Sequence, residues 1–425
     1  MSKFLIIGPR LTYHFGGPSV ILGLTRALRE QVKNCQISLA CVSPDHERER
    51  IATAQHGLGF INLPSGFKNR LSMLAAAILM RFYPKLSIGS KSVRRFLCTV
   101  RDSDVVIVAT AIGSIDGEKG IRGIISYGLS NYAFGLAKLF RKPTVQYTSD
   151  FGPLRQFWNR TFTKFWLGQF ADIIICRSSE SRRWLTDIGI STEKLMDAPD
   201  CGFLFEAARS QKIESLMKNF TGAPLVGFGV SFQVRKRFSD PLKYDRLVKS
   251  FIRYLTNDQG YYVLLIPNET HPQFAQKDDL QLATRITKEL DNNLVSFLDT
   301  NTFSASEVKS AIGNCEVVVS SRYHTLLACL SMGVPCIGIG WHHKYEAMFR
   351  MFEMQNWTLH FSQCNEKNLI ETFDNLFNER HNLKKTILQN LPAVEKAIRC
   401  TASKVCVKIS ELAPGRIQFL ENQKQ

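Results

Sequence analysis

Two apolar strands joined by one short helix constrain the fold of this chain more than any other feature of its sequence. Glu316–Ser320 is largely apolar and β-branched, and this composition predicts a buried strand. The amphipathic segment Tyr323–Met332 predicts a helix that ends at the turn Gly333–Pro335. A second apolar run, Cys336–Gly340, completes a βαβ unit. Because ligands of open α/β sheets bind at the carboxyl ends of the strands, this unit also predicts the position of a binding site.

The same alternation of strand and helix runs through the whole chain, which at 425 residues is long enough for two domains. Further strands are predicted at Phe4–Gly8, Ile37–Val42, Asp104–Ala109, Thr144–Tyr147, Asp172–Cys176, Leu225–Ser231, Tyr262–Ile266 and Leu294–Leu298. This order predicts an α/β protein with two doubly wound, Rossmann-like domains. We place the N-terminal domain at residues 1–205, a polar linker at 206–222, the C-terminal domain at 223–395, and a C-terminal helix and tail at 396–425. Pro392 is expected to interrupt the helical segment that leads into this tail.

Arg322 and His324 lie where the first strand of the βαβ unit passes into its helix. Backbone N–H groups and the helix dipole favour an anion at such a position, and a guanidinium can bind phosphate or carboxylate through two parallel hydrogen bonds. An imidazole can transfer a proton near neutral pH. The alternative is that Arg322 pairs with a structural acid and that His324 is an ordinary histidine at the start of a helix.

Loops of the N-terminal half carry further candidates at the ends of predicted strands. Gly16 and Gly17 permit close approach of the backbone to a ligand. Asp116 and Asp150 each bring a carboxylate to the same edge of the sheet. An ordinary turn explains the two glycines equally well, and an aspartate in a loop commonly caps a helix or forms a turn.

Cationic and acidic residues also follow strands in the C-terminal half. Arg235 comes after the strand that ends at Ser231, with Arg237 as the alternative if the loop is longer, and a solvated basic loop is the simpler interpretation. Asp278 and Asp279 are expected to act electrostatically at the start of a helix.

The net charge of +17 predicts anionic partners, among which are phosphate ligands, acidic glycans, lipid head groups and nucleic acid. The sequence contains no nucleic-acid-binding motif, so we expect no specific nucleic-acid partner. The eleven cysteines form no C-x-x-C pair, and several fall within predicted strands or helices. This pattern predicts reduced core thiols in a cytoplasmic protein, with neither a zinc site nor a disulfide framework.

The longest apolar run, Leu71–Met80, has ten residues and is too short to span a bilayer. It is flanked by Lys68, Arg70, Arg81 and Lys85, so it could lie on the anionic inner face of the plasma membrane. The alternative is a packed helix with basic ends.

The motifs of the βαβ unit resemble those of the polysaccharide pyruvyl transferase family. Members carry a Ser/Thr-Arg-Leu-His helix start, a Gly-Val-Pro turn, an apolar strand and a Tyr-x-x-Lys-like segment. The corresponding segments here are Ser321–His324, Gly333–Pro335, Cys336–Gly340 and Trp341–Lys344.

The resemblance is looser in the N-terminal half. Ser149–Pro153 is similar to a Ser-x-Gly-Pro segment of the family, and Arg177–Ser181 is similar to its Arg-x-x-x-Ser segment. Two loops depart from the pattern. Phe15–Val20 stands where the family has Gly-Asn-x-Gly-Asp-Glu-Ala, and the glycine-rich loop before Asp116 keeps only Gly113.

The resemblance implies a GT-B-like architecture in which the two domains face a cleft. It also implies transfer of pyruvate from phosphoenolpyruvate onto two hydroxyls of a glycan sugar as a cyclic ketal, in exopolysaccharide or cell-surface glycan biosynthesis, with no cofactor beyond this co-substrate and no metal. His324 would then be the acid/base, and the donor would be bound by Arg322, Arg235, Lys344 and Ser321.

On the same resemblance, Gly16, Gly17, Asp116 and Asp150 would bind the glycan acceptor, either free or lipid-linked. Two alternatives stay open at this point. One is a GT-B glycosyltransferase that uses a nucleotide-sugar donor, and the other is a non-enzymatic basic protein that binds membrane or nucleic acid.

Overall fold

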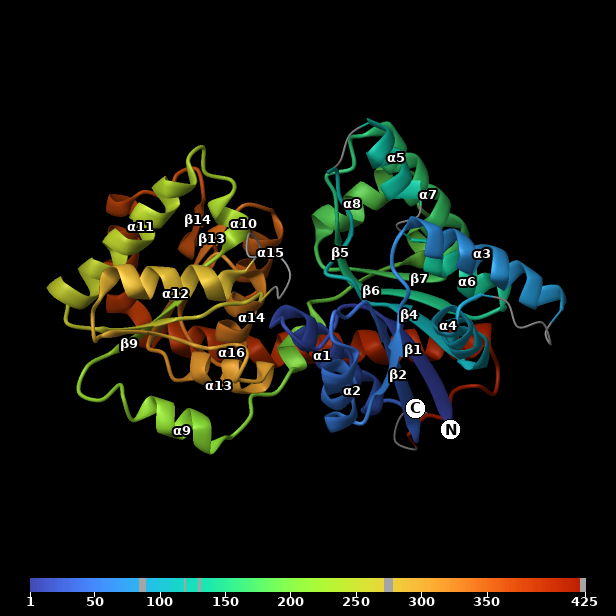
Figure 1. The fold of residues 1–425 in the computed structure, drawn as a ribbon, viewed down its shortest axis with the longest axis horizontal. Coiled ribbons are helices and arrows are strands. Elements are labelled where there is room, and N and C mark those ends of the chain that lie inside the picture. The colour runs from blue at the N-terminus through green and yellow to red at the C-terminus, as the bar shows by residue number, and fades with distance from the viewer. Residues whose placement is uncertain (84–88, 118–119, 129–130, 271–277, 421–425) are drawn as a thin grey trace. The chain divides into compact units, whose positions relative to one another are not determined.

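The computed structural model describes residues 1–83, 89–117, 120–128, 131–270 and 278–420, and it divides the chain into two compact units, each built on its own sheet (Figure 1). The first unit comprises Met1–Thr12, Val20–Cys201 and Lys396–Gln425, and the second comprises Tyr13–Ser19 and Gly202–Glu395. Neither unit is one continuous stretch of chain, because a short N-terminal loop belongs to the second unit and the C-terminus belongs to the first. Lys85 lies outside the described residues.

The first unit contains a parallel sheet in the order β3-β2-β1-β4-β6-β7-β8, with β5 paired to β6. Its strands are β1 (Ser2–Ile7), β2 (Cys35–Cys41), β3 (Gly59–Asn62), β4 (Val105–Val108), β5 (Ile112–Ser114), β6 (Thr144–Phe151), β7 (Ile173–Cys176) and β8 (Leu195–Asp197). Every residue of β4, β6 and β7 is buried. This burial explains why β4 and β7 are continuous apolar runs in the sequence, since helices cover both faces of a parallel sheet.

The helices of the first unit supply the other half of its core. They are α1 (Gly16–Arg29), which begins in the second unit's loop, α2 (His46–Gln55), α3 (Phe67–Phe82), α4 (Lys91–Asp102), α5 (Gly120–Gly128), α6 (Tyr132–Leu139), α7 (Phe157–Phe170) and α8 (Ser179–Asp187). Buried residues of α3, α4 and α6 join residues of the strands in one hydrophobic cluster. Asp45, Ser90 and Ser178 cap α2, α4 and α8, each by accepting a hydrogen bond from a backbone N–H of the first turn.

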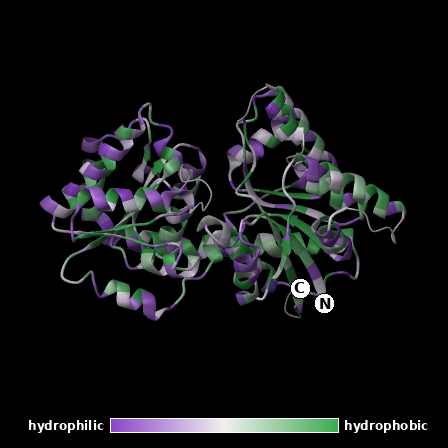
Figure 2. Cartoon of the chain, in the orientation of Figure 1, coloured by the Kyte–Doolittle hydropathy of each residue, from purple (hydrophilic) through white to green (hydrophobic). Residues whose placement is uncertain are grey.

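The second unit contains a parallel sheet in the order β11-β10-β9-β12-β13-β14. Its strands are β9 (Leu225–Gly229), β10 (Tyr262–Leu265), β11 (Val295–Phe297), β12 (Val317–Ser320), β13 (Cys336–Gly340) and β14 (Thr358–His360). This is the doubly wound order, in which the direction of winding reverses between β9 and β12. The predicted α/β class with two Rossmann-like domains is therefore confirmed. Figure 2 shows the strands of both sheets as mainly hydrophobic.

The helices of the second unit are α9 (Gln211–Met217), α10 (Phe232–Arg235), α11 (Pro241–Arg253), α12 (Asp279–Leu290), α13 (Ala305–Gly313), α14 (Tyr323–Ser331), α15 (Lys344–Arg350) and α16 (Glu366–Leu412). As predicted, α14 ends before the Gly-Val-Pro turn, where Gly333 has a φ of 71°. The expected interruption at Pro392 is wrong, because α16 continues through it and on into the first unit. Buried residues on both sides, Ile387 and Ile398, explain why the helix is kept despite the missing backbone donor.

None of the helices in the described parts of the chain combines the length and the apolar character that a membrane span requires.

Candidate functional site

The candidate site lies in the second unit, at the point where the winding of its sheet reverses. Arg322 is the N-cap residue of α14, directly after β12, and the neighbouring loops follow β9 and β10. The N-terminal loop is bound to the same edge, because the Phe15 N–H donates to the carbonyl of Asn268 (2.8 Å) and the Thr270 N–H donates to the carbonyl of Tyr13 (3.0 Å). Four segments that are distant in the sequence therefore meet at one sheet edge.

The Arg322 guanidinium is held by two acids. Its Nη2 donates to both carboxylate oxygens of Asp279, at 2.6 and 2.5 Å, and its Nη1 lies 3.6 Å from Glu269. The side chain is only 12% exposed. Burial opposes the charge, but the two carboxylates more than offset it and raise the pKa of Arg322 above its ordinary value. Arg322 is therefore a fixed cation paired with structural acids, which is the arrangement named above as the alternative.

Asp279 differs from its neighbour Asp278, although both were expected to act at the start of a helix. Asp278 does cap α12, where its side chain accepts two backbone N–H groups of the first turn. Asp279 is instead fully buried and accepts hydrogen bonds from the backbone N–H groups of Phe232 (2.9 Å), Glu269 (3.2 Å) and Asn268 (3.4 Å). This carboxylate ties the loops after β9 and β10 to the guanidinium after β12.

His324 lies in the first turn of α14, with the backbone of the N-terminal loop against its ring. A Cβ atom at Gly16 would lie 2.4 Å from His324 Nδ1 and 2.9 Å from His14 Cε1, so no side chain fits there. The Gly17 N–H donates to His14 Nδ1 at 2.8 Å. Gly16 and Gly17, expected to meet an acceptor in the N-terminal domain, are thus assigned to the second unit, and Gly16 lies beside the imidazole of His324. The ring of Tyr323 meets that imidazole edge-on, with centroids 5.3 Å apart.

A lysine and an arginine share the aromatic side chain of Trp341. Lys344 begins α15, and its Nζ lies 5.1, 5.4 and 5.8 Å from the ring centroids of Tyr323, Trp341 and Tyr345. The guanidinium of Arg237 lies 3.7 Å from the centroid of Trp341. Such contacts stabilise a cation where water is partly excluded.

Two further interactions connect the aromatic group of Tyr323, Trp341 and Tyr345 to Arg322 and its loop. Burial, reinforced by the charge of Arg322 and opposed by Tyr345, lowers the pKa of Arg237 below its ordinary value. The Tyr345 hydroxyl donates to the backbone carbonyl of Ser321 at 2.9 Å. The positive charges of Arg237 and Arg322 repel each other, and a bound anion would relieve this repulsion.

Arg235, the first choice from the sequence, has a different environment. It forms a two-point ion pair with Asp245, with distances of 2.7 and 2.8 Å, and Arg285 also binds this acid at 2.8 Å. Of the two candidates after β9, the structure brings Arg237 to the aromatic group beside Lys344. Sequence position alone did not distinguish them, because both cations lie on or just after the short helix α10.

Asp116 and Asp150 lie in the first unit and serve its own structure. Asp116 accepts the backbone N–H of Arg155 at 2.7 Å and the side-chain amide of Asn159 at 2.9 Å, and it thereby fixes the start of α7. Asp150 is buried and lies 3.5 Å from Arg177, which is itself 2.9 Å from Asp200. Both carboxylates therefore have partners within that unit.

Arg322, Arg237, Lys344 and His324 are thus brought together around one sheet edge. The cations can hold an anionic ligand, and the imidazole can move a proton to or from it. Asp279 and Glu269 were not assigned to this site from the sequence, and Gly16 and Gly17 of the loop at Tyr13–Ser19 were predicted only as acceptor-binding residues. The only local signal for Asp279 was its place in a pair of acids at the start of a helix.

Comparisons with known proteins agree with this architecture. A model of the polysaccharide pyruvyl transferase family matches residues 21–343. A search of curated proteins gave no match.

Several solved structures have a similar fold. They include HepE of Anabaena in complex with UDP-glucose (TM-score 0.58, 11% identity, covering 97% of this chain and 99% of that one) and the MnaA–UDP co-structure from S. aureus (0.56, 9%, 91% and 91%). A third is UDP-GlcNAc 2-epimerase from Neisseria meningitidis bound to UDP-GlcNAc (0.57, 11%, 96% and 99%). At such low identities the likeness shows a GT-B-like fold and nothing about the ligand.

Proposed function

Because the chain belongs to the polysaccharide pyruvyl transferase family, we propose that it transfers pyruvate from phosphoenolpyruvate onto two hydroxyls of a glycan sugar, forming a cyclic ketal. The protein is thus a transferase that acts in polysaccharide biosynthesis. The donor, the ketal product and a role in exopolysaccharide or cell-surface glycan synthesis are our proposals.

The observation that carries this proposal is the pair of cations on Trp341, Arg237 and Lys344, with His324 and the acid-paired Arg322 at the same edge of the second sheet. Phosphoenolpyruvate bears a phosphate and a carboxylate, so it needs at least two cationic contacts. Arg237 and Lys344 lie on one aromatic side chain, and Arg322 is close enough to Arg237 to affect its pKa. We assign the donor to these residues, with Arg237 taking the place that the sequence first gave to Arg235.

We assign proton transfer to His324. Protonation of the methylene carbon of phosphoenolpyruvate gives an oxocarbenium-like centre at C2, which the first sugar hydroxyl attacks with loss of its proton. Phosphate then leaves as its C–O bond breaks, and the second hydroxyl attacks C2 and loses its proton to close the ring. The cations stabilise the charge that develops on the departing phosphate. The chain's own residues supply the charge and the proton, so the scheme needs no further cofactor.

The test is His324→Ala, measured by release of phosphate from phosphoenolpyruvate in the presence of glycan. General acid–base catalysis is worth about two to four powers of ten, so the rate should fall by roughly a hundredfold or more. His381→Ala is the matched control, because His381 is an exposed histidine on α16. Undiminished phosphate release in a folded His324→Ala protein would remove His324 from the mechanism.

A thermal-shift comparison separates this reaction from glycosyl transfer. A ligand that binds only the folded protein raises the melting temperature by mass action. We expect phosphoenolpyruvate to raise it and UDP-glucose to have no effect. The opposite result would favour a nucleotide-sugar donor.

We further propose that the first unit meets the inner face of an anionic membrane, where a lipid-linked acceptor would be presented. Helices α3, α5 and α7 contain no acidic residue, and each carries at least one basic residue. Phe82, Ile121 and Phe157, one on each helix, are 73%, 76% and 69% exposed. Helix α5 packs against α7, while α3 and α7 both pack against α6. Exposed aromatic and aliphatic side chains among cations are typical of surfaces that lie on anionic lipid.

Co-sedimentation of the full-length protein with vesicles tests this assignment. Vesicles that contain phosphatidylglycerol should bind the protein more than vesicles of phosphatidylcholine alone. Replacing Phe82 and Phe157 with serine should weaken that binding about tenfold, because each removes exposed apolar area that lipid would cover. Leu242→Ser is the control, since Leu242 is a 55% exposed apolar residue of α11 in the second unit. Equal losses in both variants would contradict the proposal.

A further inference from the structure

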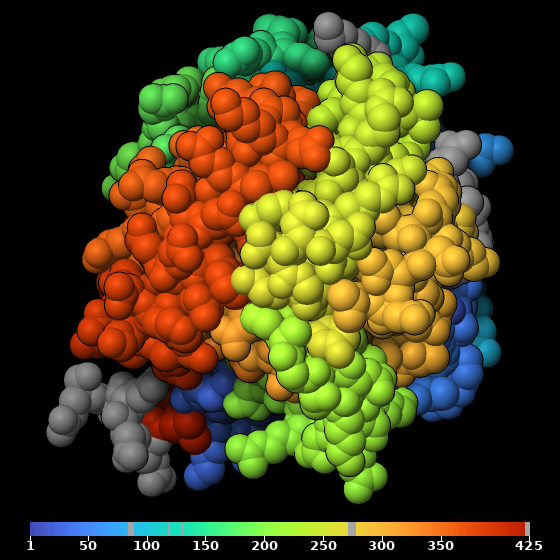
Figure 3. Space-filling view, turned by 90° about the vertical axis from the view of Figure 1, so that its left-hand side faces the viewer, coloured from blue at the N-terminus to red at the C-terminus, as the bar shows by residue number. Residues whose placement is uncertain are grey.

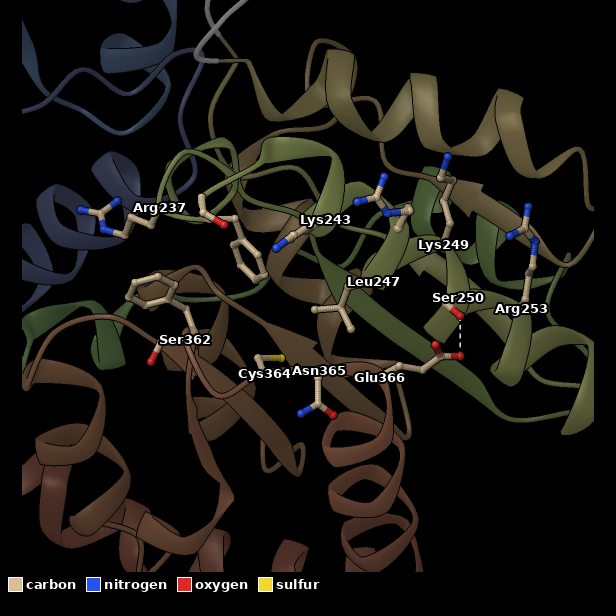
Figure 4. Close-up of a pocket in the computed structure, with 14 residues that line it drawn as sticks. Arg237, Lys243, Leu247, Lys249, Ser250, Arg253, Ser362, Cys364, Asn365 and Glu366 are labelled. Carbon is tan, nitrogen blue, oxygen red and sulfur yellow. Dashed lines mark hydrogen bonds between the residues drawn. The ribbon is translucent and has the colours of Figure 1, made fainter.

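A groove of about 990 Å³ crosses the second unit between α11 and the segment that leads from β14 into α16. Figure 3 shows this face, where α11 is yellow-green to yellow and the opposing segment is orange-red, and Figure 4 shows the side chains that line the groove. One wall is formed by residues of α11 and the loop before it. The other is formed by Phe361 and the residues up to Glu366.

The helical wall carries cations at regular intervals. Lys243, Arg246, Lys249 and Arg253 are three or four residues apart, which places them along one side of α11. From the first to the last, this row extends about 15 Å, at the rise of an α-helix. A row of this length suits a chain of anionic groups better than a single small anion.

Two of the four cations in this row are paired with acids, and the other two are not paired with any acid of the described residues. Arg246 is paired with Asp240 at 3.3 Å and Lys249 with Glu289 at 2.8 Å. In the described parts of the chain, no carboxylate lies within ion-pair distance of Lys243 or Arg253.

The opposite wall adds little negative charge. Among the described residues that line the groove, Glu366 is the one acid, and Ser250 donates a hydrogen bond to its carboxylate. The groove therefore has a clear excess of positive charge.

One end of the groove reaches the candidate site. Arg237 lines the groove and also lies over Trp341, the aromatic residue that Lys344 shares. The rings of Phe238 and Phe361 line the same end, with centroids 6.1 Å apart. Aromatic faces next to cations can pack against sugar rings while the cations bind the acidic substituents. A ligand held along α11 would thus have one end beside the residues assigned to the donor.

We propose that this groove binds a linear acidic glycan and holds it in register with the candidate site. The inference rests on the proposed function, because a pyruvate ketal keeps its carboxylate. Each modified sugar then bears a negative charge, so a chain that has been modified repeatedly is a polyanion. The groove would bind such a chain through Lys243, Arg253 and Arg237.

The test measures binding of the full-length protein to an oligogalacturonide, with phosphoenolpyruvate absent. The double variant Lys243→Gln/Arg253→Gln removes the two cations without a carboxylate partner. Its matched control is Lys218→Gln/Lys288→Gln, which removes two exposed cations of the same unit outside the groove. Circular dichroism verifies that both variants are folded.

We expect the groove variant to bind the oligogalacturonide about tenfold more weakly than the wild type, and the control variant to lose no more than about twofold. A neutral maltooligosaccharide of equal length should bind much more weakly than the oligogalacturonide. Equal affinity of the groove variant and the wild type would overturn the proposal, as would equal losses in both variants. Groove-dependent binding of phosphatidylglycerol vesicles or of DNA, without binding of the oligogalacturonide, would also overturn it.

Because no donor is present, this assay is independent of the chemistry. Groove-dependent binding in a protein that releases no phosphate from phosphoenolpyruvate would support the groove and contradict the proposed function. Phosphate release without groove-dependent binding would support the proposed function and contradict the role of the groove.

Discussion

The carboxylate of Asp279 accepts hydrogen bonds from three backbone N–H groups and from Arg322, and its side chain has no exposed surface. Such a group must be paired, because an unpaired charge in the interior is strongly unfavourable. The pair is also local to the candidate site, so its geometry fixes the position from which α14 starts. Stability and site geometry therefore depend on the same contact.

We expect Asp279→Asn to lower the free energy of unfolding of the second unit by about 3 kcal/mol, because the buried Arg322 guanidinium loses its main partner. Urea unfolding measures this loss. Asp278→Asn is the adjacent control and should change stability by less than about 0.5 kcal/mol, since asparagine caps a helix about as well as aspartate. A loss at Asp279 no larger than at Asp278 would show that the ion pair contributes little.

At the scale of single residues, Gly16 gives a second prediction, which concerns catalytic activity. A methyl group there would overlap the imidazole of His324, so Gly16→Ala should displace the ring and lower phosphate release by about a hundredfold. Gly117→Ala is the control, because its added Cβ would lie 3.7 Å from the nearest atom, a Tyr127 oxygen, in ordinary contact.

The double variant Gly16→Ala/His324→Ala tests the cause of that loss. If Gly16 acts through the imidazole, the double variant should be no slower than His324→Ala alone. Additive losses would instead indicate that Gly16 has a separate role.

At the scale of elements, long apolar strands were the most predictable part of the chain. The predicted runs at Glu316–Ser320 and Cys336–Gly340 are strands β12 and β13, because both are buried by helices and neighbouring strands. The short strands β3, β5, β8 and β14 were not predicted. Three of them, β3, β8 and β14, form the edges of their sheets, where partial exposure leaves no continuous apolar signal.

The site was predictable only where its residues are neighbours in sequence. Arg322 and His324 follow one strand and were found from their spacing. The partners of Arg322 were not, because Asp279 and Glu269 are separated from it by the intervening strands β11 and β12. The choice between Arg235 and Arg237 likewise depends on Asp245, which only tertiary packing brings to the first of them.

At the scale of the whole molecule, the C-terminal part of α16 completes the first unit. Five of its residues are fully buried, namely Ile398, Ala402, Val405, Cys406 and Ile409. Arg399 pairs with Glu30, the residue directly after α1, at 2.9 Å. The first unit is therefore not contained in the N-terminal half of the chain alone.

A fragment of residues 1–205 should lack a cooperative thermal transition, because a row of its core residues has lost the helix that covers it. Circular dichroism during heating measures this. The same fragment joined to residues 396–425 through a flexible linker should regain the transition. A cooperative transition in the shorter fragment would show that the helix is dispensable.

The division of the first unit between the two ends of the chain has a consequence for biosynthesis. Its strand β1 is made before almost all of the second unit, and the part of α16 that closes its core is made after the second unit. Part of the interior of the nascent first unit therefore stays uncovered until the whole of the second unit has been made.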